Sequence, residues 1–125
     1  MRANHNLIML HPYDLPIILC TGDKGFVSGL VELGMETDLA KEIVELIAPD
    51  HSSGYCTLVE GLNGGVFCGV MAVKSKTDYN SMAHEATHMA VKTLDWVGVE
   101  YTAESHEALA YVVGWLVQQF KQPWK

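Results

Sequence analysis

Residues 81–90 read SMAHEATHMA and decide which fold and which chemistry the chain is expected to have. They contain the pattern H-E-x-x-H, in which His84 and His88 lie four residues apart and Glu85 directly follows the first histidine. On a helix, residues four apart lie on one face with about 5–6 Å between their Cβ atoms. Both imidazoles can therefore reach one metal ion. The alternative is two ordinary helix histidines that lie one turn apart.

The glutamate of this pattern has a separate chemical role. Glu85 is about 100° further round the helix than His84, so we do not expect it to compete as a metal ligand. A catalytic zinc ion binds histidine nitrogens at about 2.0–2.1 Å and keeps one position for water. Zinc lowers the pKa of that water, and a carboxylate can take its proton as it attacks a carbonyl carbon. The pattern predicts a hydrolytic zinc site with Glu85 as the general base.

The residues around the two histidines are uncharged, which predicts a buried active-site helix. Ala86 and Thr87 lie between the histidines, and Met89 and Ala90 follow them. Without a metal, two histidines on a buried face would carry polar atoms with no evident partner. This context favours metal binding over two ordinary helix histidines.

The last helix is expected to supply a third ligand, because catalytic zinc usually has three protein ligands. Its start, ESHEALAY at residues 104–111, offers Glu104, His106 and Glu107. Around the helix axis, the centre of an apolar stripe is expected about 120° from Glu107, which places this residue at the border of the stripe. Glu107 is therefore the favoured ligand. Glu104 points to solvent and is the second choice, whereas His106 is expected to be a core histidine, with the third ligand as its alternative role. The stripe consists of Leu109, Ala110, Val113, Leu116, Val117 and Phe120.

Length and composition predict one domain spanning residues 1–125. Apolar residues make up 49% of the chain and charged residues 18%, which favours a well-filled core. The net charge of −7 argues against a nucleic-acid partner, because binding phosphates requires a basic surface. No stretch approaches the roughly 18 apolar residues of a membrane span, so no membrane partner is expected.

The N-terminal segment and the cysteines favour a cytoplasmic protein. The apolar runs of residues 1–22 are split by residues 11–14, which is not typical of a signal peptide. Cys20, Cys56 and Cys68 are odd in number and form no C-x-x-C pattern. We therefore expect them to be small buried residues in a reducing compartment rather than a disulfide framework.

Periodicity and turn residues predict the element order ββααββαα in an α+β domain. Gly34 is expected to cap the first helix, and Thr37 to occupy the N-cap of the second. The expected strands are residues 6–11, 16–20, 54–61 and 64–73. The expected helices are residues 24–34, 37–48, a third that begins between 77 and 81 and ends at 98, and a fourth between 103 and 122.

The two C-terminal helices resemble those of gluzincin-type zinc metallopeptidases, in which H-E-x-x-H on one helix is completed by a glutamate on a later one. In that class the ligand glutamate is typically followed by alanine and comes about twenty residues after the second histidine. Glu107 and Ala108 match both features, with Glu107 nineteen positions beyond His88. Residues 80–120, about a third of the chain, are most similar to small phage-associated peptidases.

The resemblance implies a zincin-like α+β fold, with a small mixed or antiparallel sheet packed on the H-E-x-x-H helix and a C-terminal ligand helix. It implies a metallopeptidase that binds one Zn2+ through His84, His88 and Glu107 and acts on a peptide or protein substrate. In such folds the strand before the active-site helix is a sheet edge that pairs with extended substrate. Residues 64–73 hold that position in the sequence.

The chain also departs from the gluzincin pattern. Tyr111 replaces the aspartate that follows the ligand glutamate by four residues, and we expect no counterpart of the C-terminal domain that supplies a transition-state-stabilising histidine in that class. The group that stabilises the oxyanion stays open among Tyr79, Tyr101, His106 and Tyr111.

These departures keep two other functions open. One is a zinc-containing binding or regulatory module without catalysis on the same scaffold, and the other is a metal-free structural protein. Asp95 is expected to be a solvated carboxylate, or else to orient a ligand histidine. Trp96, Trp115 and Trp124 are expected to pack in the core, with contacts in a homo-oligomer as the alternative.

Overall fold

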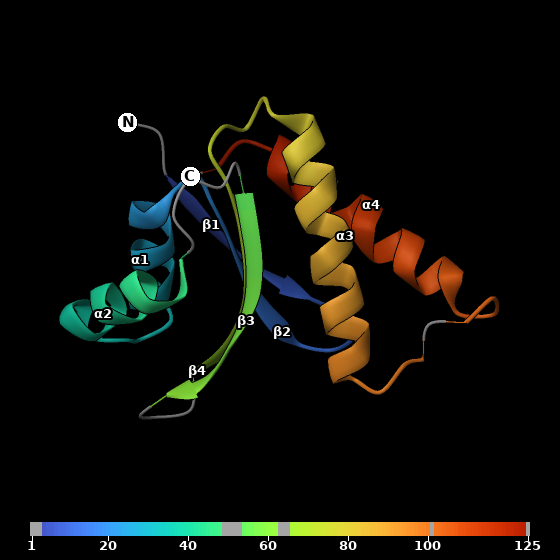
Figure 1. Cartoon of the computed structure of the whole chain (residues 1–125), viewed down its shortest axis with the longest axis horizontal. Helices are drawn as coiled ribbons and strands as arrows, with labels where there is room; N and C mark the ends of the chain where they lie inside the picture. The colour runs from blue at the N-terminus through green and yellow to red at the C-terminus, as the bar shows by residue number, and fades with distance from the viewer. Residues whose placement is uncertain (1–3, 49–53, 63–65, 101, 125) are drawn as a thin grey trace.

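The protein is an α+β domain in which a four-stranded sheet lies between two pairs of helices (Figure 1). The computed structural model describes residues 4–48, 54–62, 66–100 and 102–124. The elements, in chain order, are β1 (His5–Leu10), β2 (Leu15–Cys20), α1 (Asp23–Glu32), α2 (Thr37–Ile47), β3 (Gly54–Leu62), β4 (Val66–Val73), α3 (Tyr79–Trp96) and α4 (His106–Lys121). The expected order ββααββαα is confirmed.

The sheet is mixed and has the strand order β1-β2-β4-β3. β1 pairs with β2 and β3 with β4 in antiparallel fashion, whereas β2 and β4 are parallel, with Ile17 opposite Gly69. The prediction that residues 64–73 form a sheet edge is wrong, because β4 lies between β2 and β3. β4 returns beside β2 after the two helices, so its hairpin partner β3 is left as the outer strand.

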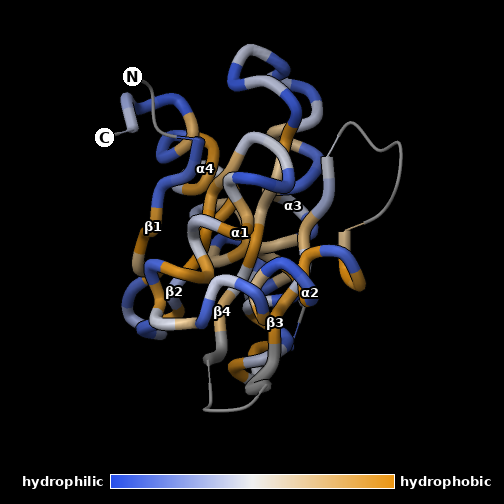
Figure 2. Tube along the Cα trace, turned by 90° about the vertical axis from the view of Figure 1, so that its left-hand side faces the viewer, coloured by the Kyte–Doolittle hydropathy of each residue, from blue (hydrophilic) through white to orange (hydrophobic). Residues whose placement is uncertain are grey.

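Alternation along the central strands builds two separate cores, one on each face of the sheet. Leu15, Ile17 and Leu19 of β2 face α3 and α4, whereas Ile18 and Cys20 face α1 and α2. All five are fully buried. Figure 2 shows the strands as predominantly hydrophobic segments, with hydrophilic segments on the helices around them. The burial of β2 on both faces explains its nearly continuous apolar sequence.

Helix α1 approaches β2 closely because two glycines lie on its inner face. A Cβ atom built on Gly29 would lie against three carbons of Ile18, two of them at 2.9 Å. A Cβ atom on Gly25 would meet the backbone of Asn4 and the Cβ of Cys20, the latter at 2.8 Å. The spacing of four residues places both glycines on one helix face, so this face has no room for side chains.

Glycine and aspartate mark the helix ends. Gly34 and Gly98 follow the C-caps of α1 and α3 with φ values of 104° and 84°, which confirms both expected ends. The expected N-cap at Thr37 is wrong by one residue, because Glu36 occupies that position without a side-chain cap. Asp78 caps α3.

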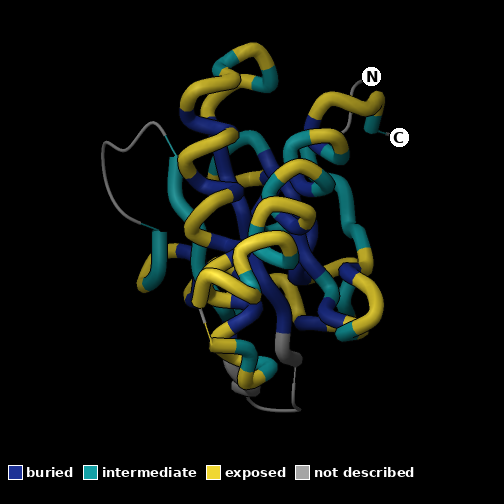
Figure 3. The backbone as a smooth tube through the Cα atoms, turned by 90° about the vertical axis from the view of Figure 1, so that its right-hand side faces the viewer, coloured by how far each residue is buried: buried dark blue, intermediate teal, exposed yellow. Residues whose placement is uncertain are grey.

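The side of the molecule formed by α3 and α4 carries exposed residues along both helices, with the buried strands behind them (Figure 3). None of the helices in the described ranges is long and apolar enough to cross a membrane. The three cysteines are free thiols, with Cys20 and Cys68 buried and Cys56 half-buried, as expected of small core residues.

Candidate metal site

Helix α3 carries the H-E-x-x-H pattern and begins at a well-defined cap. The backbone N–H of Ser81 donates to Asp78 Oδ1 at 3.0 Å, and the Ser81 hydroxyl donates to Oδ2 at 2.7 Å. These hydrogen bonds hold the pKa of Asp78 below its usual value. The cap fixes the start of the helix, and with it the face on which each later residue lies.

The structure brings the two histidines of the pattern together. The Nε2 atoms of His84 and His88 lie 3.2 Å apart, with their ring planes at 75°. Two nitrogens bound to one tetrahedral zinc at 2.0–2.1 Å would lie about 3.3 Å apart. A single hydrogen bond between opposite tautomers is also compatible with this distance. Both imidazoles therefore converge on one point in front of the helix.

The face that carries the histidines is open to solvent, which corrects the prediction of a buried histidine face. His84 and His88 are exposed, whereas Met82, Ala86 and Met89 are fully buried. Met82, Ala86 and Met89 belong to the core on the α3 and α4 side of the sheet, whereas the two imidazoles and Thr87 are exposed. Solvent can therefore reach the point where the two rings converge.

Glu85 is the buried residue of the pattern. Its exposed fraction is 7%, and it lies on the flank of α3 that faces the edge strand β3. A Cβ atom on Gly54, the first residue of β3, would lie 3.1 Å from Glu85 Cγ and 3.3 Å from Oε2. The missing side chain at position 54 thus leaves room for the carboxylate between the helix and the sheet edge.

Cys56 is the second β3 residue beside this carboxylate. It follows Gly54 by two positions, which places both residues on the same face of the strand. Burial, together with the neighbouring Glu85 carboxylate, raises the pKa of Cys56 to about 12. The positive charge of Lys92 acts in the opposite direction. Strand β3 therefore supplies the space for Glu85 at Gly54 and places the uncharged Cys56 thiol beside it.

The thiols are expected to react slowly with DTNB in the native protein. Burial raises the pKa of Cys68, like that of Cys56, to about 12 and the pKa of Cys20 further. At pH 8 a thiol of pKa 12 is about a thousandfold less ionised than a free one, and its thiolate fraction rises about tenfold for each pH unit toward 12. Half-buried Cys56 should react first, and all three should react at once in guanidinium chloride. A cysteine that reacts with DTNB as fast in the native protein as in the unfolded protein would contradict this prediction.

The structure does not bring Glu107 to the two histidines. Its side chain is 87% exposed, and its Oε1 lies 3.5 Å from Nε2 of the neighbouring His106. The buried residues of α4 are Val112, Leu116 and Phe120, whose mean direction is about 180° from Glu107. The predicted stripe has its centre about 120° from Glu107, because it includes Ala110, which is exposed, and omits Val112. The prediction that Glu107 lies at the border of the apolar face is therefore wrong.

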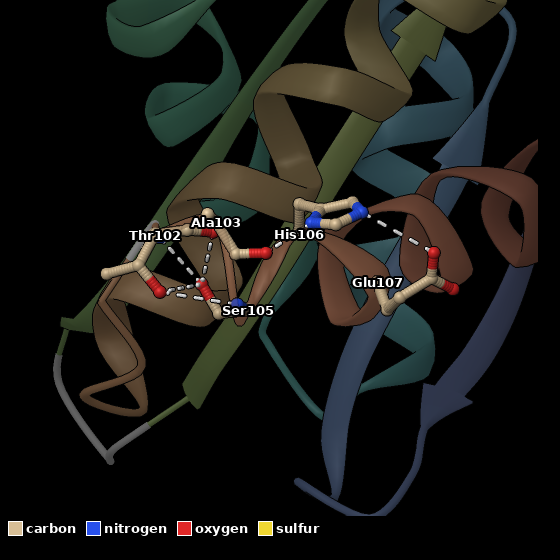
Figure 4. A network of polar contacts seen from close by, with 5 residues as sticks. All are labelled: Thr102, Ala103, Ser105, His106 and Glu107. Atoms are coloured by element: carbon tan, nitrogen blue, oxygen red, sulfur yellow. Dashed lines mark hydrogen bonds and ion pairs between the residues drawn. The ribbon is translucent and has the colours of Figure 1, made fainter.

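The first turn of α4 is held by a local hydrogen-bond network (Figure 4). The N–H of Thr102 donates to Ser105 Oγ at 2.8 Å, and His106 Nδ1 bonds the carbonyl oxygen of Ala103. His106 is exposed, so the prediction of a core histidine is wrong. Glu104 precedes the helix and is also exposed. In the described parts of the chain, no three His, Cys, Asp or Glu residues form a group that could hold a metal ion.

The described candidates for oxyanion stabilisation are Tyr79, His106 and Tyr111. Tyr79 lies at the start of α3, where the Lys121 ammonium is 5.6 Å from its ring centroid, and Tyr111 is 66% exposed on α4. Within the described residues, neither tyrosine nor His106 makes a hydrogen bond or ring contact with His84 or His88. Tyr101 lies outside the described residues.

The tryptophans pack mainly as core residues. Trp115 and Trp124 are half-buried against the core on the α3 and α4 side, whereas Trp96 is 45% exposed. The Lys76 ammonium lies 4.1 Å from the Trp124 ring centroid. These contacts fit the favoured expectation for Trp115 and Trp124.

Comparisons with protein-family models, with curated proteins and with solved structures found no match. The roles of individual residues therefore follow from the geometry of the site. Two residues of that geometry, Gly54 and Cys56, carried no signal in the sequence, because their place beside Glu85 depends on how α3 packs against β3. A glycine that opens a strand is ordinarily a turn residue.

Proposed function

We propose that the protein is a zinc-dependent hydrolase, a small metallopeptidase in which His84 and His88 bind the metal and Glu85 is the general base. The observation that carries this proposal is the 3.2 Å separation of the two Nε2 atoms on the exposed face of α3. Glu85 lies beside this face at the sheet edge. The resemblance to gluzincins supports the same roles for these three residues.

The two histidines fit a shared zinc ion, because their nitrogens are at the separation that tetrahedral coordination requires. A bound zinc ion would polarise a substrate carbonyl and make water acidic enough to lose a proton near neutral pH. Solvent access to the histidine face leaves room for both water and substrate.

Glu85 moves the proton in this proposal. Its carboxylate takes a proton from the attacking water and donates it to the leaving amine nitrogen, as general-base and then general-acid catalysis requires. Gly54 and Cys56 keep the side chain in its position at the sheet edge. A fixed carboxylate loses little orientational freedom during the reaction.

Glu107 is proposed as the third protein ligand. Its support is the spacing from His88 and the following alanine, both of which match the gluzincin pattern. Leu109, in the same turn, lines a pocket together with Val91 and Lys92, which lie one turn beyond His88. This turn of α4 therefore borders the same surface of α3, although the Glu107 carboxylate must reorient to reach the metal. Glu107→Gln should then weaken zinc binding by more than tenfold, whereas Glu104→Gln should not.

Added zinc is expected to stabilise the folded protein. At a free zinc concentration one hundred times the Kd, linkage contributes about 2.7 kcal/mol, which corresponds to a rise in Tm of about 10 °C for a chain of this size. His84→Ala should abolish the shift, and His11→Ala, which removes an exposed histidine between β1 and β2, should retain it. Differential scanning fluorimetry with and without a chelator measures both.

The hydrolase proposal is tested by zinc content and turnover together. Purified, unchelated protein should contain one zinc per chain and cleave a peptide library, and chelation should stop the cleavage until zinc is restored. A protein that contains no transition metal and has no activity when zinc is added would rule the proposal out.

A zinc-containing binding module is the second candidate, and one observation favours it. Within the described residues only two protein ligands converge, and they do so on an open surface. This candidate predicts stoichiometric zinc without turnover on any peptide library, and a stable protein partner that co-purifies.

A further inference from the structure

A pocket of about 470 Å³ lies directly beyond the histidine pair on α3. Val91 and Lys92 follow His88 by three and four residues and therefore lie one turn further along the same side of the helix. The remaining lining comes from the end of α3, the following turn and the first half of α4. The lining residues are Val91, Lys92, Leu94, Asp95, Val99, Glu100 and Leu109.

The walls of this pocket are aliphatic and its far end is negatively charged. Leu94 is buried, and Val99 and Leu109 are half-buried. Asp95 and Glu100 are exposed, and neither carboxylate has an ion pair or hydrogen bond within the described residues. Asp95 also lies in the last turn of α3, where no basic residue offsets the negative end of the helix dipole.

The one cation of the lining does not neutralise this end. Lys92 lies about two turns beyond Glu85 on α3 and therefore on the flank of the helix that faces β3. α4, which supplies Leu109, packs on another side of α3. In the described parts of the chain, neither carboxylate therefore has a positively charged partner.

We infer that this pocket is the subsite for a lysine or arginine side chain of the peptide that the histidine site acts on. The inference rests on the proposed function and names its substrate class. A long basic side chain would lay its methylene groups along Val99 and Leu109 and place its cation beside Asp95 and Glu100. Because the pocket lies one turn beyond His88, the side chain of a substrate residue near the scissile bond can reach it.

Binding to the full chain, without turnover, tests the pocket separately from the enzyme. Nα-acetyl-arginine amide and its neutral counterpart, Nα-acetyl-citrulline amide, are titrated into protein with labelled methyl groups, with and without zinc. The methyl signals of Val91, Val99 and Leu109 should shift, and the Kd for the arginine probe should be about fivefold lower.

A matched pair of variants isolates the two carboxylates. Asp95→Asn with Glu100→Gln should remove the arginine preference, whereas Asp38→Asn with Glu42→Gln on α2 makes the same change in net charge and should retain it. Equal affinity for both probes, or shifts confined to other residues, would overturn the subsite. A protein that binds the arginine probe in this way but hydrolyses no peptide would instead refute the enzyme and leave the pocket in place.

Discussion

Replacing Glu85 with glutamine is expected to lower kcat/KM for peptide hydrolysis by about 10²- to 10⁴-fold, the usual contribution of a general acid or base. Glutamine has nearly the same shape as glutamate, so it should fill the same space beside Gly54. It cannot take a proton from water at neutral pH. Because Glu85 is not expected to be a ligand, zinc content should stay at one ion per chain.

The experiment needs two readouts beside activity. Zinc content by mass spectrometry and Tm by scanning fluorimetry should match those of the parent protein, and Glu42→Gln on the exposed face of α2 serves as the control. Hydrolysis retained by Glu85→Gln would defeat the assignment of the base. Loss of zinc together with activity would show instead that the carboxylate is a ligand.

Replacing Gly29 with alanine is expected to destabilise the fold by about 1–3 kcal/mol. The new methyl group would overlap Ile18, which is fully buried in the central strand β2 and cannot move aside. Overpacking of this kind typically costs about 1–3 kcal/mol, and α1 would have to shift from the sheet to relieve it. Urea denaturation should show a lower midpoint with a similar slope.

Gly114→Ala provides the matched control for this prediction. Gly114 lies inside α4 with nothing within 4 Å of an added Cβ atom, so alanine should stabilise the helix by about 0.5–1 kcal/mol. The same substitution is therefore expected to act with opposite signs in two helices. A stable Gly29→Ala protein would mean that α1 does not pack against β2 as described.

The order of the elements could be predicted from the sequence because local signals set it. Gly34 and Gly98 end two helices where expected, and short apolar runs between turn residues mark the strands. The strand order could not be predicted in this way. The parallel pairing of β2 with β4 depends on how the α1–α2 connection crosses the sheet, and this pairing makes β3 the edge.

The site was predictable to the extent that it lies on one helix. The spacing of His84 and His88 placed their imidazoles together, and the structure shows that convergence. The direction of Glu107 was not predictable, because Ala110 and Val112 are both apolar and only packing shows which of them is buried. Glu85 was expected at the site, but its burial against β3 depends on Gly54, thirty-one positions earlier in the chain.

The parallel contact between β2 and β4 has a consequence for biosynthesis. Residue 17 pairs with residue 69, so β2 leaves the ribosome long before its neighbour in the sheet has been translated. β1, α1 and α2 can dock on β2 in that interval, but one side of the strand keeps unpaired backbone groups. The nascent chain is therefore most open to association with other chains until residues 66–73 emerge, and the histidine helix, which packs on the finished sheet, can dock only after that.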